Sequence, residues 1–144
     1  MAATTAPATA GAATPRALTA ANSLVVSDGL CVALVPDGWV DDGAGRGSTL
    51  GGATFALFGG RLATPEDWTR AADLVVAQAG ARSGATVRRT DDLVLVTFAD
   101  NRGFEARRRF ADRYCDIAVS GSKAVPASER AFWTAIVDSL TPAP

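Results

Sequence analysis

Histidine is absent from this chain of 144 residues, and cysteine occurs at two positions only, Cys31 and Cys115. The chain therefore lacks the commonest general base and the commonest metal ligand in proteins. A Ser-His-Asp triad is excluded, neither thiol can be activated by a histidine, and two cysteines cannot complete a four-ligand zinc site. These absences predict a protein that is not an enzyme and that uses no metal and no cofactor. An enzyme would have to rely on Asp, Glu, Arg or Tyr114, or on an external cofactor.

Lysine is scarce as well, because Lys123 is the single lysine among 14 cationic residues and the others are arginine. The 15 acidic residues bring the formal net charge to -1, and there is no basic tail, so no nucleic-acid partner is expected. Long hydrophobic runs are missing too, since no stretch approaches the ~18 apolar residues of a transmembrane segment. A chain of 144 residues, 48% of them hydrophobic, fits one ordinary globular domain.

The N-terminal segment is poor in the residues that build a core, because residues 2–21 are largely Ala, Thr, Pro and Gly. Such a composition buries too little apolar surface to offset chain entropy, so a disordered tail is predicted for residues 1–22 and one domain for residues 23–144. The segment does not itself resemble a signal peptide, because it has no early Lys or Arg and no Leu-rich block. Tails of this kind commonly follow a cleaved signal or a lipidated cysteine, which favours export; a natural cytoplasmic start at Met1 is the alternative.

Hydrophobic patterning divides the rest of the chain into strands and two helices. Short apolar runs rich in β-formers and bounded by Gly, Pro or Asp predict strands, and an Asp- and Gly-rich loop is expected over 41–52. The expected order is strands over 24–26, 30–35 and 53–58, a helix over 65–79, strands over 85–90, 93–99, 103–111 and 113–120, and a helix from about Ser128 to Thr141.

The sequence from Thr64 to Asp67 is the clearest helix start in the chain. Thr64 is suited to cap, Pro65 fits the first helical position, and the acidic residues after it complement the positive end of the helix dipole. Apolar residues then recur at helical spacing as far as Ala79, and Gly80 is expected to end the helix. The closing helix carries a similar apolar stripe, which consists of Phe132, Trp133, Ile136, Val137 and Leu140.

The serial order of strands decides the fold class. Four strands joined by short polar turns follow the first helix, which indicates an antiparallel meander. We therefore predict an α+β fold in which a mostly antiparallel sheet is packed by two helices.

Three segments of the chain resemble a known superfamily. A strand ending in Val-Pro-Asp-Gly-Trp over 35–39, a Thr-Pro-Glu-Asp-Trp helix start over 64–68, and a closing Trp-Thr-Ala-Ile-Val-Asp-Ser-Leu helix over 133–140 are similar to the PsbP/Mog-like superfamily, over about residues 24 to 140. The resemblance is to its bacterial lipoproteins and to the DUF1795-type chaperones of type VI secretion. It implies an α/β/α sandwich and a non-enzymatic binding or assembly role, but not a ligand. The long tail and the two cysteines depart from the secretion chaperones and favour the exported branch.

Cys31 lies in an early predicted strand and Cys115 in a late one. Antiparallel sheets often place such strands side by side, within the Cα separation that a disulfide needs. A disulfide between them would fit an oxidising compartment, and two separate buried thiols are the alternative.

Arginines gather in the late meander, where Arg102, Arg107, Arg109 and Arg113 are close in sequence. Along an extended strand Arg107 and Arg109 share one face, and Arg108 shares the other with Phe104 and Phe110. Arg107 and Arg109 are thus predicted to face solvent, where they could bind an anionic partner, or cross-strand acids such as Glu105 or Asp116.

A second predicted contact surface is the glycine-rich loop together with Trp39. The run from Gly43 to Thr49 lacks the Walker spacing and the following lysine, and it leads to a strand, so it is a mobile surface loop and not a phosphate loop. Trp39 follows a Pro-Asp-Gly corner, where its indole lies either in the core or in a binding cleft. The predicted binding residues are Trp39, Arg46, Arg102, Arg107 and Arg109.

Two functional hypotheses follow. The first is an extracytoplasmic binding protein, exported or lipid-anchored through a removed leader, whose partner is a protein or a small anionic ligand. The alternative is a cytoplasmic chaperone or adaptor for a type VI secretion effector, with an apolar groove on the sheet for helical segments of its client.

Overall fold

The computed structural model describes residues 13–144 of the chain. Its main sheet is antiparallel throughout and has seven strands in the order β3-β4-β5-β9-β8-β7-β6. A smaller antiparallel sheet has the order β1-β2-β10. The strands of the main sheet are β3 (Val40–Asp41), β4 (Arg46–Ser48), β5 (Thr54–Arg61), β6 (Thr86–Arg89), β7 (Leu93–Thr97), β8 (Gly103–Arg109) and β9 (Arg113–Ser120).

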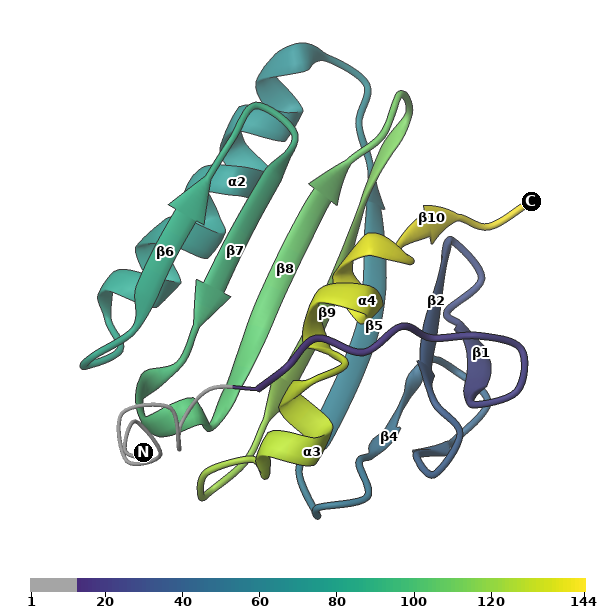
Figure 1. Cartoon of the computed structure of the whole chain (residues 1–144). Helices are drawn as coiled ribbons and strands as arrows, with labels where there is room; N and C mark the ends of the chain where they lie inside the picture. Colours follow the sequence, from purple (N-terminus) through teal and green to yellow (C-terminus); the bar gives the residue numbers. More distant parts are fainter. Residues whose placement is uncertain (1–12) are drawn as a thin grey trace.

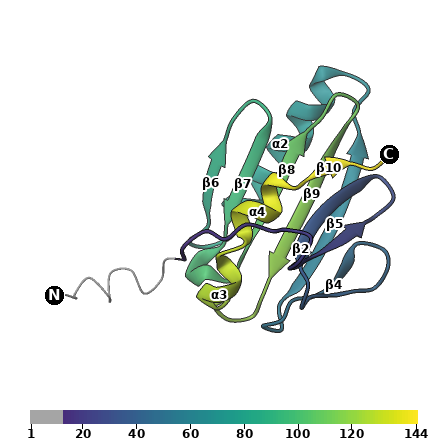
Figure 2. The same cartoon turned by 45° about the vertical axis from the view of Figure 1, so that its right-hand side comes forward.

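Helices cover both faces of the main sheet, as Figures 1 and 2 show. The helix α2 (Pro65–Gly80) packs on β6, β7 and β8 on one side. The short helices α3 (Ala127–Arg130) and α4 (Trp133–Asp138) lie on the other side, together with the small sheet of β1 (Ser23–Ser27), β2 (Cys31–Pro36) and β10 (Thr141–Pro142). The predicted α+β class and the predicted sandwich of helices around an antiparallel sheet are confirmed.

The two-residue alternation of the strands produces two hydrophobic cores. On β7, Val94 and Val96 face α2 and pack with Trp68 and Val75. The intervening Leu93 and Leu95 face the opposite side and join the core beneath α4. Each helix therefore covers its own set of side chains from the same strands.

The beginning of α2 follows the local sequence. The Asp67 carboxylate accepts hydrogen bonds from the backbone N–H groups of Ala63 (2.8 Å) and Thr64 (2.9 Å), which would otherwise lack partners at the helix start. These bonds, the one from Thr64 first, lower the pKa of Asp67. The predicted apolar face is confirmed, with Trp68, Ala72, Val75 and Ala79 buried.

The closing helix differs from the prediction, because it is divided into α3 and α4. The Phe132 N–H bonds to the carbonyl of Glu129, three residues back, where an unbroken α-helix would bond four residues back. The predicted stripe is still directed inward, since Phe132, Ile136, Val137 and Leu140 are buried and Trp133 is partly buried against the core.

The segment expected to be a loop over 41–52 also contains regular structure. The short strands β3 and β4 pair across its glycine-rich turn, with Val40 opposite Ser48. Gly47 allows this pairing, because a Cβ at that position would come within 1.7 Å of the Val40 carbonyl oxygen. The loop prediction was therefore wrong at this hairpin.

The predicted tail divides into two parts. Residues 1–12 lie outside the described part of the chain. Residues 13–22 run across the α3–α4 side of the domain, where the Arg16 N–H donates to the Ala131 carbonyl (2.8 Å) and Leu18 packs against the core. Within residues 13–144, none of the helices has the length and apolar character needed to span a membrane.

Candidate functional site

A hollow of the described chain lies on the open half of the main sheet, beside α4. We call it the sheet groove; it has a volume of about 320 Å³. It exists because α3 and α4 cover β9 and the middle of the sheet but leave the β6–β7 half exposed on this side (Figures 1 and 2). Its lining is formed by Ala13, Arg88, Leu93, Leu95, Thr97, Asn101, Phe104, Arg130, Trp133, Thr134, Val137 and Asp138.

The floor of the sheet groove is apolar. Leu93, Leu95 and Thr97 of β7 point toward this side, and Phe104 of β8 is directly opposite Thr97 in the strand register. Leu93 and Leu95 are only partly buried, whereas a covering helix would bury them completely. The exposed apolar surface is thus part of the hollow and not part of a closed core.

The wall of the sheet groove is an aromatic pair. The Trp133 ring packs on Phe104 with ring centroids 5.1 Å apart, and Val137 stands one helical turn further on. The Trp133 Nε1 is buried and has no hydrogen-bond partner within the described residues. The partly exposed Trp133 side chain therefore presents an aromatic surface against which an apolar ligand can pack.

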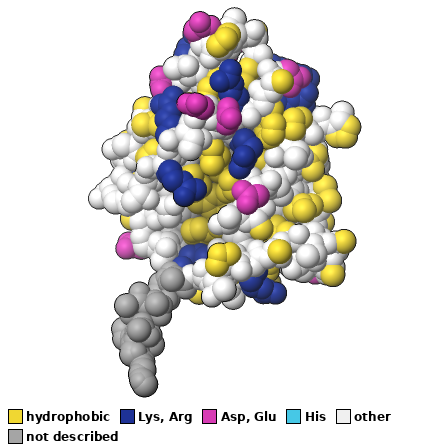
Figure 3. Space-filling model, turned by 45° about the horizontal axis from the view of Figure 1, so that its top comes forward, with side chains coloured by type: hydrophobic (Ala, Val, Ile, Leu, Met, Phe, Trp, Pro, Cys, Tyr) yellow, Lys and Arg dark blue, Asp and Glu magenta, His cyan; other side chains and the backbone are white. Residues whose placement is uncertain are grey.

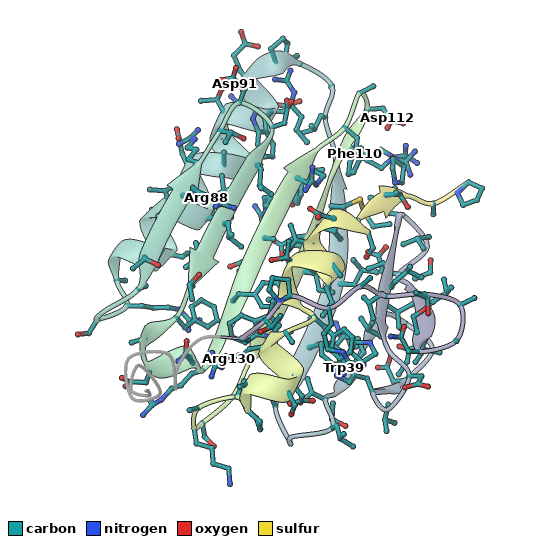
Figure 4. All side chains as sticks on the ribbon, in the orientation of Figure 1. Trp39, Arg88, Asp91, Phe110, Asp112 and Arg130 are labelled. Carbon is teal, nitrogen blue, oxygen red and sulfur yellow. A yellow bond between two sulfur atoms is a disulfide. The ribbon has the colours of Figure 1, made fainter. Side chains whose placement is uncertain are left out.

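Arginines occupy the rim. Arg88 of β6 is opposite Leu95 in the strand register and borders the sheet groove at the β6 edge. Arg130 of α3 borders the same groove at its helix edge (Figure 4). Arg130 is held by a bond from its Nε to the Val125 carbonyl (2.9 Å), and the acid in the lining, Asp138, is 3.7 Å from Arg108. In the space-filling view, hydrophobic side chains gather between Lys/Arg side chains (Figure 3).

The charge of this rim differs from that of the whole chain. Two arginines and one aspartate line the sheet groove, and that aspartate already pairs with a third arginine, whereas the formal net charge of the chain is -1. Positive charge around an apolar floor is complementary to an anion with an apolar body.

The predicted residue Trp39 borders a different hollow, which we call the corner cavity. Trp39 itself is 4% exposed and packs on Phe55 with ring centroids 5.1 Å apart, so its ring is part of the core. The corner cavity, about 260 Å³, is also lined by Glu129, Phe132 and the exposed loop residue Leu50. Trp39 and the 43–52 loop thus meet, as the sequence analysis grouped them, but away from the sheet groove.

Arg107 is buried beneath α2 and takes no part in the open surface. Its Nε donates to Asp116 (2.9 Å) and its Nη1 to the Ala71 carbonyl (3.0 Å), and its guanidinium lies over the rings of Phe58 and Tyr114. Of the two orientations expected for this residue, the structure has the one that faces a cross-strand acid. The Arg107 guanidinium is thus occupied by contacts within the fold.

Burial has a strong effect on the carboxyl group that pairs with Arg107. Desolvation raises the pKa of Asp116 well above its usual value, and a hydrogen bond and repulsion from Glu105 add to this rise. The Arg107 guanidinium acts in the opposite direction but does not outweigh burial. Two carboxyl groups share one guanidinium here, so one of them holds its proton more tightly.

The other predicted arginines are scattered. Arg46 is exposed at the start of β4, Arg102 is exposed in the β7–β8 connection, and Arg109 is half-buried at the opposite end of β8. The alternation along β8 is confirmed, since Phe104 and Ala106 face α4 while Arg107 faces α2. The structure does not unite the predicted binding residues in one site.

Cys31 and Cys115 form a disulfide with a Cα–Cα distance of 5.7 Å. Both residues are fully buried, and the bond connects β2 of the small sheet to β9 of the main sheet. The predicted pairing is present in the structure, although the two strands belong to different sheets and are not neighbours in one ladder.

Sequence reasoning missed the groove residues Arg130 and Trp133 as ligand contacts. Trp133 belongs to an apolar helical stripe, which normally indicates core packing, and Arg130 lies in the polar part of the same stretch. Arg88 lies in the predicted strand over 85–90, but the sequence does not show which residues lie beside it. One signal was available in the sequence. Leu93 and Leu95 are apolar residues on one face of a predicted strand, and a short closing helix cannot cover all the apolar surface on that face of the sheet.

Fold and groove together define a small α/β/α sandwich with an open pocket on one face of its sheet. By sequence, no known protein family matches the chain, and no curated protein matches it. Among solved structures it is similar to the solution structure of cyanobacterial PsbP (CyanoP) from Synechocystis sp. PCC 6803, with a TM-score of 0.46 and 14% sequence identity, over 92% of this chain and 99% of that chain. Membership of the PsbP/Mog-like superfamily, and of its lipoprotein or chaperone branch, stays a prediction.

Proposed function

We propose that the chain is a non-enzymatic, extracytoplasmic binding protein that holds a small amphipathic anion in the sheet groove. The observation that carries this proposal is the combination of an apolar floor, Leu93, Leu95 and Phe104, with Arg88 and Arg130 at the rim. A carboxylate or similar head group would lie between the arginines, and its apolar body would pack against Trp133.

The size of the sheet groove favours a small molecule over a protein segment. Its volume of about 320 Å³ lies at the lower end of small-molecule pockets. A client helix with side chains is about 10–12 Å across and would need a longer groove. For this reason we propose the binding of a small anion first, and a cytoplasmic chaperone or adaptor only as the alternative function.

The disulfide supports the extracytoplasmic part of the proposal. Structural disulfides persist in oxidising compartments and are rare in the cytosol. Export, with or without a lipid anchor on a removed leader, is consistent with the buried Cys31–Cys115 bond. Free thiols in protein isolated from its own cell would contradict this part.

Calorimetric titration with octanoate, n-octylamine and octanol tests the ligand class, because the three share an apolar body and differ in head-group charge. Octanoate should bind most tightly. Arg88→Glu should weaken octanoate binding by about tenfold or more, because it replaces an attraction with a repulsion. Amide chemical-shift changes should centre on Leu95, Phe104 and Thr134, which belong to the groove lining.

Arg46→Glu is the matched control, since Arg46 is an exposed arginine outside the sheet groove. It makes the same change of charge and should leave octanoate binding within about twofold. Equal binding of octylamine and octanoate, or equal effects of the two substitutions, would overturn the proposal.

A further inference from the structure

A second, smaller hollow lies at the end of α2, apart from the sheet groove. We call it the arginine hollow; its volume is about 180 Å³. Three separate segments meet there: the residues after α2, the β7–β8 connection and the end of β9. Its lining is formed by Arg82, Ser83, Phe98, Ala99, Arg102, Ser120 and Gly121.

The polar side chains of this lining are cationic or neutral. It holds two guanidinium groups and two hydroxyl groups and, within the described chain, no acidic side chain. Six other arginines are paired with Asp or Glu, namely Arg61, Arg70, Arg89, Arg107, Arg108 and Arg113. In the described residues neither Arg82 nor Arg102 has such a partner, although Asp100 is only two positions from Arg102.

The two arginines are also held in place. The Arg82 guanidinium lies over the Phe98 ring, 4.2 Å from its centroid, so part of its side-chain freedom is already lost. The backbone of Arg102 is fixed from both sides, since its N–H donates to Ala99 (3.3 Å) and its carbonyl accepts from Gly121 (2.8 Å). A ligand would therefore meet the partly preorganised guanidinium of Arg82, beside a second arginine, Arg102, whose backbone is fixed.

The backbone that leads to Arg102 is unusual. Asp100 and Asn101 both have left-handed φ angles, 60° and 55°, a conformation that Asp and Asn adopt more readily than other non-glycine residues. Such residues allow a tight connection between β7 and β8. The tight connection brings Arg102 beside the end of α2.

We infer that the arginine hollow binds a phosphate monoester dianion. Two guanidiniums with no acid in the lining are balanced by a ligand that carries about two negative charges, which a phosphate monoester has near pH 7. The planar fork of arginine matches phosphate oxygens in bidentate geometry, and Ser83 and Ser120 can donate to a third oxygen.

Titration of the full chain with inorganic phosphate and with methyl phosphate, at constant ionic strength and followed by amide chemical shifts, tests this inference. Shifts should appear at Ser83, Ser120 and Gly121 for both ligands. Arg102→Gln and Arg82→Gln should each weaken binding about tenfold or more, because each removes a charge-assisted hydrogen-bond donor. Arg102→Lys should restore part of the loss, since it keeps the charge but not the fork.

Controls separate this site from the sheet groove and from general charge effects. Arg46→Gln should leave phosphate binding unchanged, and Arg102→Gln should leave octanoate binding unchanged while its circular dichroism stays that of the parent.

Phosphatidic acid vesicles provide the monoester in membrane form, and binding to vesicles without binding to methyl phosphate would overturn the soluble-ligand inference. Equal phosphate binding by the parent and the Arg82→Gln/Arg102→Gln double variant would overturn it too.

Discussion

At the scale of single residues, the most consequential group is the buried charge cluster of Glu105, Arg107 and Asp116. Arg107 is 4% exposed and Asp116 is fully buried, so neither charge is compensated by water. The Asp116 Oδ1 is buried and has no hydrogen-bond partner in the described chain, so burial penalises the charged form of this carboxyl group. The cluster is electrically balanced when one of its two carboxyl groups is neutral.

This cluster predicts a pH dependence of stability. The pKa of Asp116 is raised in the folded state, so its stabilising contribution is complete below the unfolded pKa and is lost as pH rises through the raised folded value. Glu105→Gln removes the repelling carboxylate and lowers the pKa of Asp116, so the variant should lose less stability than the parent between pH 4 and pH 8. Urea unfolding across this range measures the effect.

Glu66→Gln is the control for that experiment, because Glu66 is exposed in the first turn of α2. Its profile should run parallel to that of the parent. If the Glu105→Gln profile were also parallel to that of the parent, the assignment of the pH dependence to this cluster would be wrong.

At the scale of elements, α4 connects the fold to the proposed function. One side of this short helix enters the core through Ile136 and Val137, and its other contacts form the wall of the sheet groove through Trp133 and Thr134. A helix of six residues has little stability of its own, so it depends on packing. Loosening α4 should therefore affect both stability and octanoate binding.

Ile136→Ala tests this dependence. Ile136 is fully buried, and its truncation should lower the free energy of unfolding by about 2–5 kcal/mol through lost burial and a cavity. Octanoate binding should weaken as well, because Trp133 is no longer held against Phe104. Leu74→Ala on the exposed face of α2 is the matched control and should change stability by no more than about 0.5 kcal/mol in urea unfolding.

At the scale of the whole molecule, the disulfide joins parts that the hydrogen-bond ladders leave separate. The small sheet and the main sheet share no strand pairing in the described residues, and Cys31–Cys115 connects them across a separation of 84 positions. A crosslink that closes so long a loop restricts the unfolded chain strongly.

Replacing both cysteines by alanine should therefore destabilise the protein by about 4–5 kcal/mol in the chain-entropy treatment of disulfides. Chemical unfolding of the parent and of the Cys31→Ala/Cys115→Ala variant measures the difference. Parent protein unfolded in the presence of a reductant should fall to the stability of the variant. Unchanged stability on both routes would show that packing alone holds the two sheets together.

Much of the fold could be predicted because it depends on local patterns. The start of α2 at Thr64–Pro65, the meander after it and the face alternation along β8 follow from spacing and capping chemistry, which act between residues close in sequence. The hairpin within 41–52 could not be seen, because its pairing depends on the close approach that Gly47 permits.

The amino-acid sequence by itself determined which side chains are available for chemistry, since it contains no histidine and its main cation is arginine, whose guanidinium group suits anions. Only the tertiary structure decided which arginines are accessible. Arg107 lies under α2 and forms an ion pair with Asp116, whereas Arg88, Arg82 and Arg102 line hollows. The physical reason is that accessibility depends on which elements pack above a residue, and that packing joins segments far apart in the chain.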